Sequence, residues 1–489
     1  MVGAPAAAYY RRVAFGVIGV SGLVCGTVAH AGDWTITPRI SASEVFTDNS
    51  GLNTDNEERQ SDFVTQVSPG LSITGTGGRT SLNLDYSFDQ SFYHRNTQGD
   101  ENSNTLAALG QVELWKRIFF VEGRASISQV IVDDTEGTSI SPAGRNINRT
   151  EARTFNISPF IRQHLGQWLE LEPRFTFNRT TTESDVVDDT KTRTGTITVN
   201  SGRRFALFPW SIVAFDKKTQ NDGSEPSELE RRIDGSLSYV LHRQLTLTGA
   251  VGWEDVRDPG LDTQPKGITW SGGFTARPSS RSSLQFSYGE RNDEREVGAE
   301  ASYRLSERTS VNASFSESIQ TSQDLIANAL RFLAVDTNNN LIDTRTGGPA
   351  TADTIFGFGL DENTFRQQLF RLGFSGTRRR NSFFGSAFWE KRDTEATDVT
   401  EKSFGGNFSF TRDLSPRLRG SVGVAVQTTD FGTTDDREEI DYSASTSLSY
   451  QVRNDIRATV SYNLTLTKVN NAPDDLMENS VAIGLTKSF

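Results

Sequence analysis

Apolar residues alternate with small polar residues along most of the chain, and this period of two predicts β-strands with one apolar and one wet face. The first segment places Trp34, Ile36 and Ile40 on one face, with Thr35 and Ser41 on the other. The same alternation is clearest at residues 82–88, 245–253, 440–450 and 456–466. About 22 such segments follow one another, each roughly 9 to 13 residues long, which suits a tilted strand crossing a bilayer better than a strand of a soluble sandwich.

The links between these segments alternate between short and mostly longer ones. Short links are expected near residues 75–79, 115–117, 164–167, 202–208, 241–244, 278–281, 306–309, 377–381, 412–417 and 452–455. Short periplasmic turns and long external loops are typical of a transmembrane β-barrel. We therefore predict an all-β fold, a single antiparallel transmembrane barrel over residues 32–489, with both ends of the mature chain on the periplasmic side.

Charge distinguishes the two predicted rims of this barrel. The short links are rich in arginine, as at Arg203, Arg204 and residues 378–380, whereas many longer links are acidic, as at residues 435–439. All seven tryptophans fall near predicted strand ends, where amphipathic rings meet lipid headgroups. These observations support the same topology as the loop lengths.

Residues 1–31 have the pattern of a cleaved secretory signal peptide. Arg11 and Arg12 precede an apolar run, and residues 29–31 fit the small-residue cleavage rule. The only cysteine, Cys25, lies in this segment, so the exported chain is expected to have no thiol. The net charge of −12 argues against a partner whose phosphates must be neutralised, and we expect no nucleic-acid binding.

The last predicted strand, residues 481–489, ends in Phe489. It resembles the terminal strand that the outer-membrane insertion machinery of Gram-negative bacteria reads, which makes Phe489 the predicted assembly signal. Lys487 departs from the apolar or aromatic residue often found two places before the end. We expect the last strand to pair with the first, because lipid offers no hydrogen-bond partner to an open edge. The expected location is the Gram-negative outer membrane, with its lipid, lipopolysaccharide and insertion machinery as partners.

A more specific resemblance is carried by the N-terminal part of the mature chain, at residues 34–38, 45–49, 62–71, 82–86 and 119–129. These segments resemble an outer-membrane β-barrel family associated with PEP-CTERM protein-sorting systems, with Phe46 standing where a tyrosine is expected. Members of that family tend to accompany exopolysaccharide gene clusters. The resemblance implies a channel or accessory conduit for exopolysaccharide secretion, with the polymer and its export proteins as partners. The alternatives are a general diffusion porin and a surface assembly or adhesion protein anchored by its barrel.

Catalytic chemistry has little support in the sequence. The mature chain has three histidines, of which only His94 is placed to act as a base, and the usual hydrolase, zinc and phosphate-loop motifs are missing. Acidic loops can attract divalent cations, but their spacing is not that of a calcium loop. We expect no enzyme, no catalytic residues, no cofactor and no metal site. Acids and bases share strands on the inward face, which predicts crosswise pairing rather than an ion path of a single charge sign.

The longest predicted loop, residues 321–365, contains a partial helical stripe that includes Leu325, Leu330 and Leu333. A loop of this length usually has a role or is mobile. Three arrangements are open: a lid outside the barrel, a segment folded into the lumen, or disorder. In the second arrangement these three leucines are the predicted constriction.

Overall fold

The computed structural model describes residues 32–54, 58–95, 97–133, 138–144, 147–184, 186–222, 227–258, 264–291, 294–330, 333–335, 341–343, 360, 363–394, 397–432, 437–470 and 475–489. The predicted signal peptide, residues 1–31, lies outside this range. The regular elements are β1 (Gly32–Thr47), β2 (Asp62–Gly77), β3 (Thr80–Tyr93), β4 (Glu101–Trp115), β5 (Phe119–Ile131), β6 (Arg149–Ile161), β7 (Gln163–Leu165), β8 (Leu169–Thr182), β9 (Thr190–Ser201), η1 (Arg203–Phe205), β10 (Trp210–Asn221), β11 (Glu228–His242), β12 (Leu245–Arg257), β13 (Lys266–Ser279), β14 (Ser282–Arg291), β15 (Glu294–Ser306), β16 (Thr309–Gln320), α1 (Ser322–Ala329), β17 (Leu333–Val335), β18 (Leu341–Asp343), β19 (Phe365–Arg378), β20 (Asn381–Thr394), β21 (Val399–Asp413), β22 (Leu418–Asp430), β23 (Glu438–Arg453), β24 (Ile456–Val469) and β25 (Leu476–Ser488).

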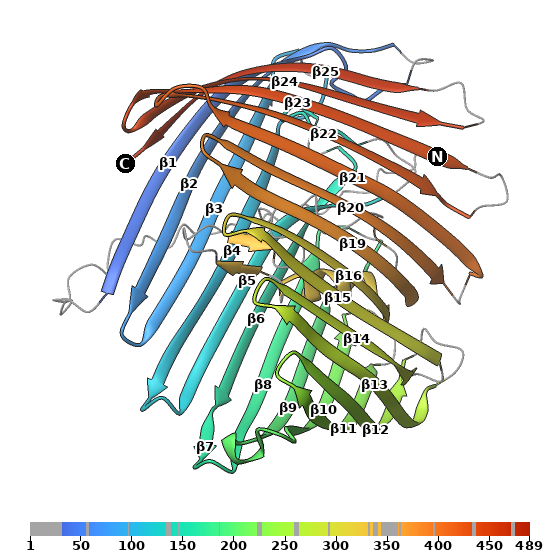
Figure 1. The fold of residues 1–489 in the computed structure, drawn as a ribbon. Helices are drawn as coiled ribbons and strands as arrows, with labels where there is room; N and C mark the ends of the chain where they lie inside the picture. Colours follow the sequence, from blue (N-terminus) through green and yellow to red (C-terminus); the bar gives the residue numbers. More distant parts are fainter. Residues whose placement is uncertain are drawn as a thin grey trace, which may run out of the picture.

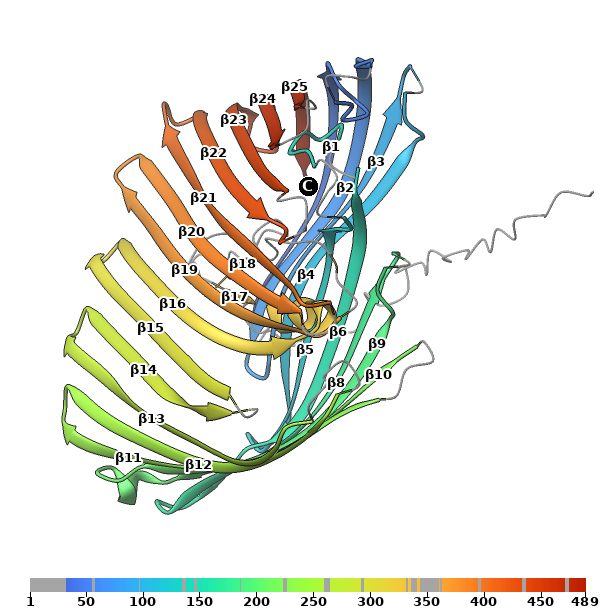
Figure 2. The same ribbon diagram turned by 90° about the vertical axis from the view of Figure 1, so that its right-hand side faces the viewer.

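The main sheet closes on itself as an antiparallel barrel (Figures 1 and 2). Its 23 segments include β6 and β7, which both pair with β8 and form one strand interrupted at Arg162, so the barrel has 22 strands. The seam is the pairing of β1 with β25, where Arg39 lies opposite Ser488. The predicted all-β closed barrel is confirmed, and the described ends of the chain lie at the rim of short turns.

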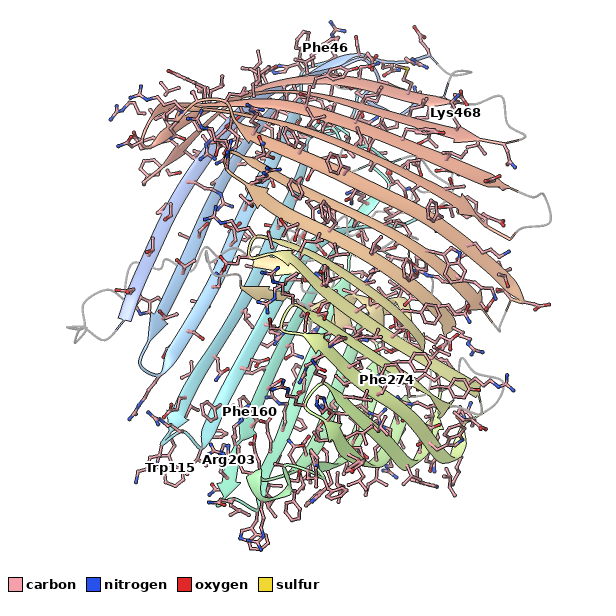
Figure 3. All side chains as sticks on the ribbon, viewed as in Figure 1. Phe46, Trp115, Phe160, Arg203, Phe274 and Lys468 are labelled. Carbon is pink, nitrogen blue, oxygen red and sulfur yellow. The ribbon has the colours of Figure 1, made fainter. Side chains whose placement is uncertain are left out.

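The two faces of the wall follow the alternation in the sequence. Apolar side chains that point outward are exposed on the isolated chain, among them Ile268 at 76%, Ile483 at 61% and Phe404 at 58%. Such a continuous exposed apolar band is expected only where lipid covers it. Figure 3 shows Trp115 and Arg203 at the rim of short turns and Lys468 towards the opposite rim. No helix in the described residues is long and apolar enough to cross a membrane.

The strands are longer than the sequence pattern suggested. Apart from the three-residue β7, those of the main sheet run from 10 residues in β14 to 16 in β1. The extra residues lie towards the rim of long loops, where inward positions are covered by loop residues and the strict apolar and polar alternation weakens. Val45 near the end of β1, for example, is inward-facing and fully buried.

The topology predicts opposite labelling at the two ends of β21. Ser415 lies in the short turn after this strand and Thr397 lies in the loop before it, and both are exposed. In a background in which Cys25, the only cysteine of the sequence, is replaced by serine, Thr397→Cys should react with a membrane-impermeant maleimide on intact cells, whereas Ser415→Cys should react only after the outer membrane is opened. Labelling of Ser415→Cys alone on intact cells would mean that the barrel is inserted the other way round.

Candidate functional site in the barrel lumen

The inner wall is lined by hydroxyl and amide side chains over much of its circumference. On β16 the inward positions are Asn312, Ser314, Ser316, Ser318 and Gln320, and all five border one luminal cavity. Their alternation with outward residues is the same period of two that builds the lipid-facing band. The barrel therefore encloses a polar interior within an apolar exterior.

Charged side chains of the lumen neutralise one another. Three arginines pair with the glutamate two residues earlier on the same strand, namely Arg124 with Glu122 at 2.9 Å, Arg174 with Glu172 at 3.0 Å and Arg232 with Glu230 at 3.4 Å. Pairs between strands also occur, as between Arg162 and Glu172 at 2.8 Å. The expected crosswise pairing is therefore present only in part, because several acids and bases pair along a single strand instead. These pairs leave little excess of one sign along this part of the wall.

The first part of the longest loop forms α1, which both views in Figures 1 and 2 place within the barrel. The hydroxyl of Thr321 caps this helix by accepting a hydrogen bond from the backbone N–H of Asp324 at 3.2 Å. The helix lies against β6 and β8, and its Ile326 packs on Val130 and Ala152. An apolar stripe that would be costly to expose to water is thus buried against small inward positions of the wall.

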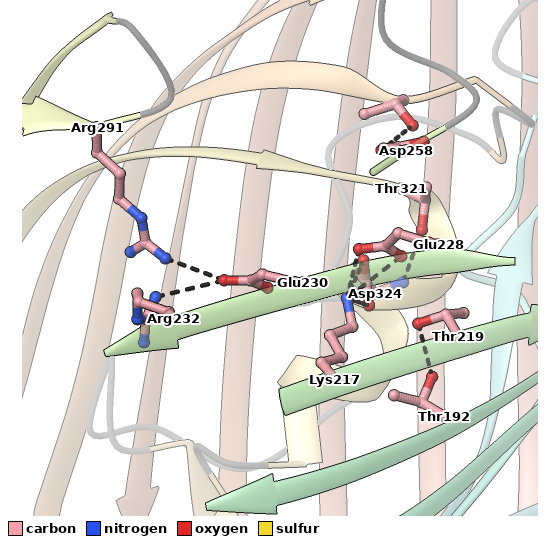
Figure 4. Close-up of polar contacts among 11 residues, drawn as sticks. Thr192, Lys217, Thr219, Glu228, Glu230, Arg232, Asp258, Arg291, Thr321 and Asp324 are labelled. Atoms are coloured by element: carbon pink, nitrogen blue, oxygen red, sulfur yellow. Dashed lines mark hydrogen bonds and ion pairs between the residues drawn. The ribbon is translucent and has the colours of Figure 1, made fainter. Parts of the chain in front are cut away.

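An ion-pair cluster fixes the first turn of α1 to the wall (Figure 4). The ammonium nitrogen of Lys217, on β10, lies 3.1 Å from a carboxylate oxygen of Glu228, on β11, and 3.1 Å from one of Asp324, on α1. All three side chains are less than a fifth exposed, at 14%, 18% and 19%. Burial of this kind makes each charge depend on its partners, because removal of one leaves the others desolvated and unpaired.

The other end of α1 is also tied to the wall. The guanidinium of Arg124 donates a hydrogen bond of 2.7 Å to the carbonyl oxygen of Leu330, which is almost fully buried. Near the start of α1, the Gln323 side-chain amide adds a weaker hydrogen bond of 3.4 Å to the carbonyl oxygen of Asp188. Helix α1 is therefore attached at several points on one arc of the wall.

A second loop, between β5 and β6, also folds inward. Ala143 is buried with Val45, Val64, Tyr93 and Ala482, which lie near the long-loop ends of their strands. The Tyr93 hydroxyl donates a hydrogen bond of 2.5 Å to the carbonyl oxygen of Ala143. The described part of this loop therefore covers the inner wall near the seam of the barrel.

Buried polar contacts hold this second loop in place. The hydroxyl of Ser139 and that of Thr47 both donate to the carboxylate of Glu478, on β25, the latter at 2.7 Å. Sequence reasoning missed this inward fold. The one signal was that residues 138–144 carry no charged side chain, unlike the acidic residues just before them.

Two cavities of similar size lie beside these inward segments. One, of about 600 Å³, lies along β14, β15, β16 and β19 and is bordered by Leu325, Asn328 and Ala329 of α1. The other, of about 570 Å³, lies along β20 to β24 and is bordered by Thr138 and Ile140 of the β5–β6 loop. The first cavity ends at β19 and the second begins at β20, and these two strands are paired, so the two cavities follow one continuous stretch of wall. We refer to the inward residues of this stretch, from β14 to β24, as the polar arc.

The sequence predicted two functional groups of residues, the constriction leucines of the longest loop and the assembly signal Phe489. Leu325 and Leu330 are buried on the inner side of the barrel, whereas the side chain of Leu333 lies outside the described residues. A constricting role for these leucines stays a prediction. The backbone N–H of Phe489 donates to the carbonyl oxygen of Pro38 at 2.9 Å, and its ring lies 4.5 Å from the Lys487 ammonium. The role of Phe489 in assembly also stays a prediction.

His94, the only candidate base, lies at the rim of long loops. Its Nε2 atom is 2.7 Å from the Thr65 hydroxyl and 3.6 Å from a carboxylate oxygen of Glu44. Thr65 and Glu44 occupy outward positions, so this group is not part of the lumen. Within the described residues, no cluster of three or more histidine, cysteine, aspartate or glutamate side chains is arranged to hold a metal ion.

The chain is similar to a family model and to solved structures of known proteins. A family model described as "Putative beta-barrel porin 2" matches residues 27–209. No curated protein matches the chain. The ferric-catecholate import receptor Fiu from E. coli K12 is similar over 94% of this chain and 82% of its own, at 8% identity and a TM-score of 0.50. OprD from Pseudomonas aeruginosa is similar over 93% of this chain and 95% of its own, at 10% identity and a TM-score of 0.33.

The protein is a porin-like outer-membrane β-barrel. The likeness to Fiu shows the barrel fold alone, since so low an identity carries no information on cargo. The family match covers the N-terminal strands of the barrel, which include the segments behind the family resemblance seen in the sequence. The outer-membrane β-barrel part of that expectation is confirmed, and the family match adds the porin-like description. The link to a PEP-CTERM system and to exopolysaccharide stays a prediction.

Proposed function

We propose that this porin-like barrel is a conduit for secretion of an exopolysaccharide across the outer membrane, linked to a PEP-CTERM system. The observation that carries the proposal is the polar arc, whose serines, asparagines and glutamines border two luminal cavities. Hydroxyl and amide groups can exchange hydrogen bonds with a hydrated sugar polymer without binding it tightly to any one charge. The cargo class itself comes from the family resemblance of the N-terminal segments.

The charge pattern of the lumen supports a neutral or weakly charged cargo. Arg124, Arg174 and Arg232 are each paired with a neighbouring glutamate, so they offer little net field to attract or repel ions. Transport of this kind requires no catalytic group, and we infer a channel rather than an enzyme. Lipopolysaccharide, the insertion machinery and the polymer's export proteins are the partners that this function implies.

The alternative is a general diffusion porin, which the description of the matching family favours. A polar lumen suits small hydrophilic solutes as well as a polymer, and the two functions differ in what happens when the protein is lost. A barrel that serves only as a surface anchor is a third function, and it would conduct almost no ions.

The test is to compare a deletion strain with its complemented parent. We expect secreted polysaccharide to fall sharply in the deletion strain, with polymer retained in the periplasm, and to recover on complementation. The purified barrel should conduct ions in planar bilayers. Conduction with unchanged secretion would favour the porin. Negligible conduction with unchanged secretion would favour the anchor.

A further inference from the structure

Two aromatic rings of the inner wall, those of Phe384 and Phe388, border the cavity beside the β5–β6 loop. On β20, the buried side chains of Glu390 and Arg392 face the lumen. Phe384 and Phe388 are an even number of residues away on the same strand, so their rings face the lumen as well. Both rings border the cavity of about 570 Å³, with Ser386 between them. Each is only partly buried. Aromatic rings left partly exposed in a wet lumen call for a specific reason, because their burial would be favourable.

Phe388 is held against the wall by a glycine on the neighbouring strand. Gly405 lies directly opposite Phe388, and a Cβ atom at this position would come within 2.6 Å of ring carbon Cε1. The ring therefore rests over bare backbone on one side and borders the cavity on the other. Any larger residue at 405 would push the ring away from the wall. The pairing produces a fixed apolar platform rather than a freely rotating side chain.

Polar side chains on β20, β21, β23 and β24 border the same cavity as this platform. The Ser386 hydroxyl donates a hydrogen bond of 3.1 Å to the side-chain oxygen of Asn407. The amide nitrogen of Asn407 has no hydrogen-bond partner among the described residues. On β23, Asp441 also borders the cavity, and its carboxylate accepts a hydrogen bond of 2.5 Å from the Thr467 hydroxyl and retains a second oxygen. Asn463 also borders the cavity. Apolar platforms with a few convergent polar groups are the usual composition of a small-ligand site.

We propose that this cavity binds a chain of neutral sugar units, with Phe384 and Phe388 as stacking platforms and Asn407 and Asp441 as polar contacts. A pyranose ring has an apolar C–H face that can lie on a phenyl ring, while its hydroxyls bond to amides and carboxylates at its edge. The two phenylalanines are four residues apart, a separation of roughly 13 Å along the strand. One sugar ring cannot cover both, so the ligand class is an oligosaccharide.

This inference deepens the proposed secretion function and rests on it for its biological role, although binding can be measured without secretion. The full-length barrel is purified in detergent and titrated with neutral hexasaccharides of α-1,4-glucose, β-1,4-glucose and β-1,4-N-acetylglucosamine, with glucose as a short control. Binding is followed by saturation-transfer NMR and calorimetry. We expect at least one hexasaccharide to bind and glucose to bind far more weakly.

Matched variants test whether the hexasaccharide binds at the phenylalanine platform of β20. Phe388→Ala should weaken hexasaccharide binding by about three- to ten-fold, the range expected for loss of one aromatic stacking contact. Phe388→Tyr should retain binding, and Gly405→Ala should weaken it by displacing the ring. Phe404→Ala removes an equal ring from the outer face of the adjacent strand and should leave binding unchanged. Heat-modifiable migration of each variant verifies that the barrel is folded.

Two results would overturn the site. One is no saturation transfer to any hexasaccharide, and the other is equal binding by the wild type and a folded Phe384→Ala, Phe388→Ala double variant. The proposed function fails separately: normal polymer secretion in the deletion strain would refute the conduit while a Phe388-dependent sugar site still stood.

Discussion

Replacing residues 321–364 with a two-residue Asn-Gly turn should raise the single-channel conductance of the reconstituted barrel several-fold and admit larger solutes. Gln320 at the end of β16 pairs directly with Phe365 at the start of β19, so the two strands can be joined as a tight hairpin without change to the wall. The deletion removes α1 and its buried leucines from the lumen. Conductance in planar bilayers and liposome swelling with graded sugars are the measurements.

Point variants of the Lys217 cluster test the same model with the loop still present. Lys217→Met leaves Glu228 and Asp324 facing each other without a cation, and their repulsion should release α1 from the wall. The channel should then be open for a larger fraction of the time in planar bilayers. Asp324→Asn leaves Lys217 paired with Glu228, so its effect should be clearly smaller. This order separates electrostatic attachment from a general loss of packing.

An unchanged conductance in the loop replacement, with the barrel correctly inserted, would exclude α1 as an obstruction. A large effect of Asp324→Asn together with none of Lys217→Met would show that the cluster does not hold the helix in the way its geometry indicates. Heat-modifiable migration on gels provides the control for insertion in every variant.

The barrel could be predicted from sequence because its strongest signals are local. Alternation over one strand, such as Ile456 to Leu466, needs no knowledge of any other strand, and each short turn follows within a few residues. Closure then follows from the requirement that lipid imposes on unpaired backbone groups. The interruption at Arg162, between β6 and β7, gave no such local signal.

The contents of the lumen depend on contacts between distant residues. Lys217 and Asp324 are separated by 107 residues, and Ser139 and Glu478 by 339. The apolar stripe of α1 is visible in the sequence, but the sequence pattern does not say which arc of the wall offers Val130 and Ala152 to receive it. Likewise, an inward phenylalanine such as Phe388 becomes notable only once Gly405 is known to lie opposite it.

Deleting Phe489 should sharply reduce the amount of heat-modifiable, membrane-integrated barrel while synthesis and export remain intact. The residue contributes a backbone hydrogen bond to Pro38 at the seam, and it is 67% exposed, on the outer side near the rim of short turns. Fractionation of membranes followed by gel migration of heated and unheated samples measures the effect.

The size of this effect distinguishes two roles for Phe489. Loss of one seam hydrogen bond costs only about 1 kcal/mol, which is small beside the rest of the seam, from Arg39 opposite Ser488 to Thr47 opposite Ser480. A sharp loss of assembly would therefore reflect recognition of the ring during insertion rather than stability of the closed barrel. Phe489→Ala, which keeps the backbone bond, should then be as defective as the deletion, and Lys487→Phe should assemble at least as well as the wild type. If only the deletion is defective, closure of the seam rather than the ring is what Phe489 provides, because Phe489→Ala removes the ring and retains the bond to Pro38.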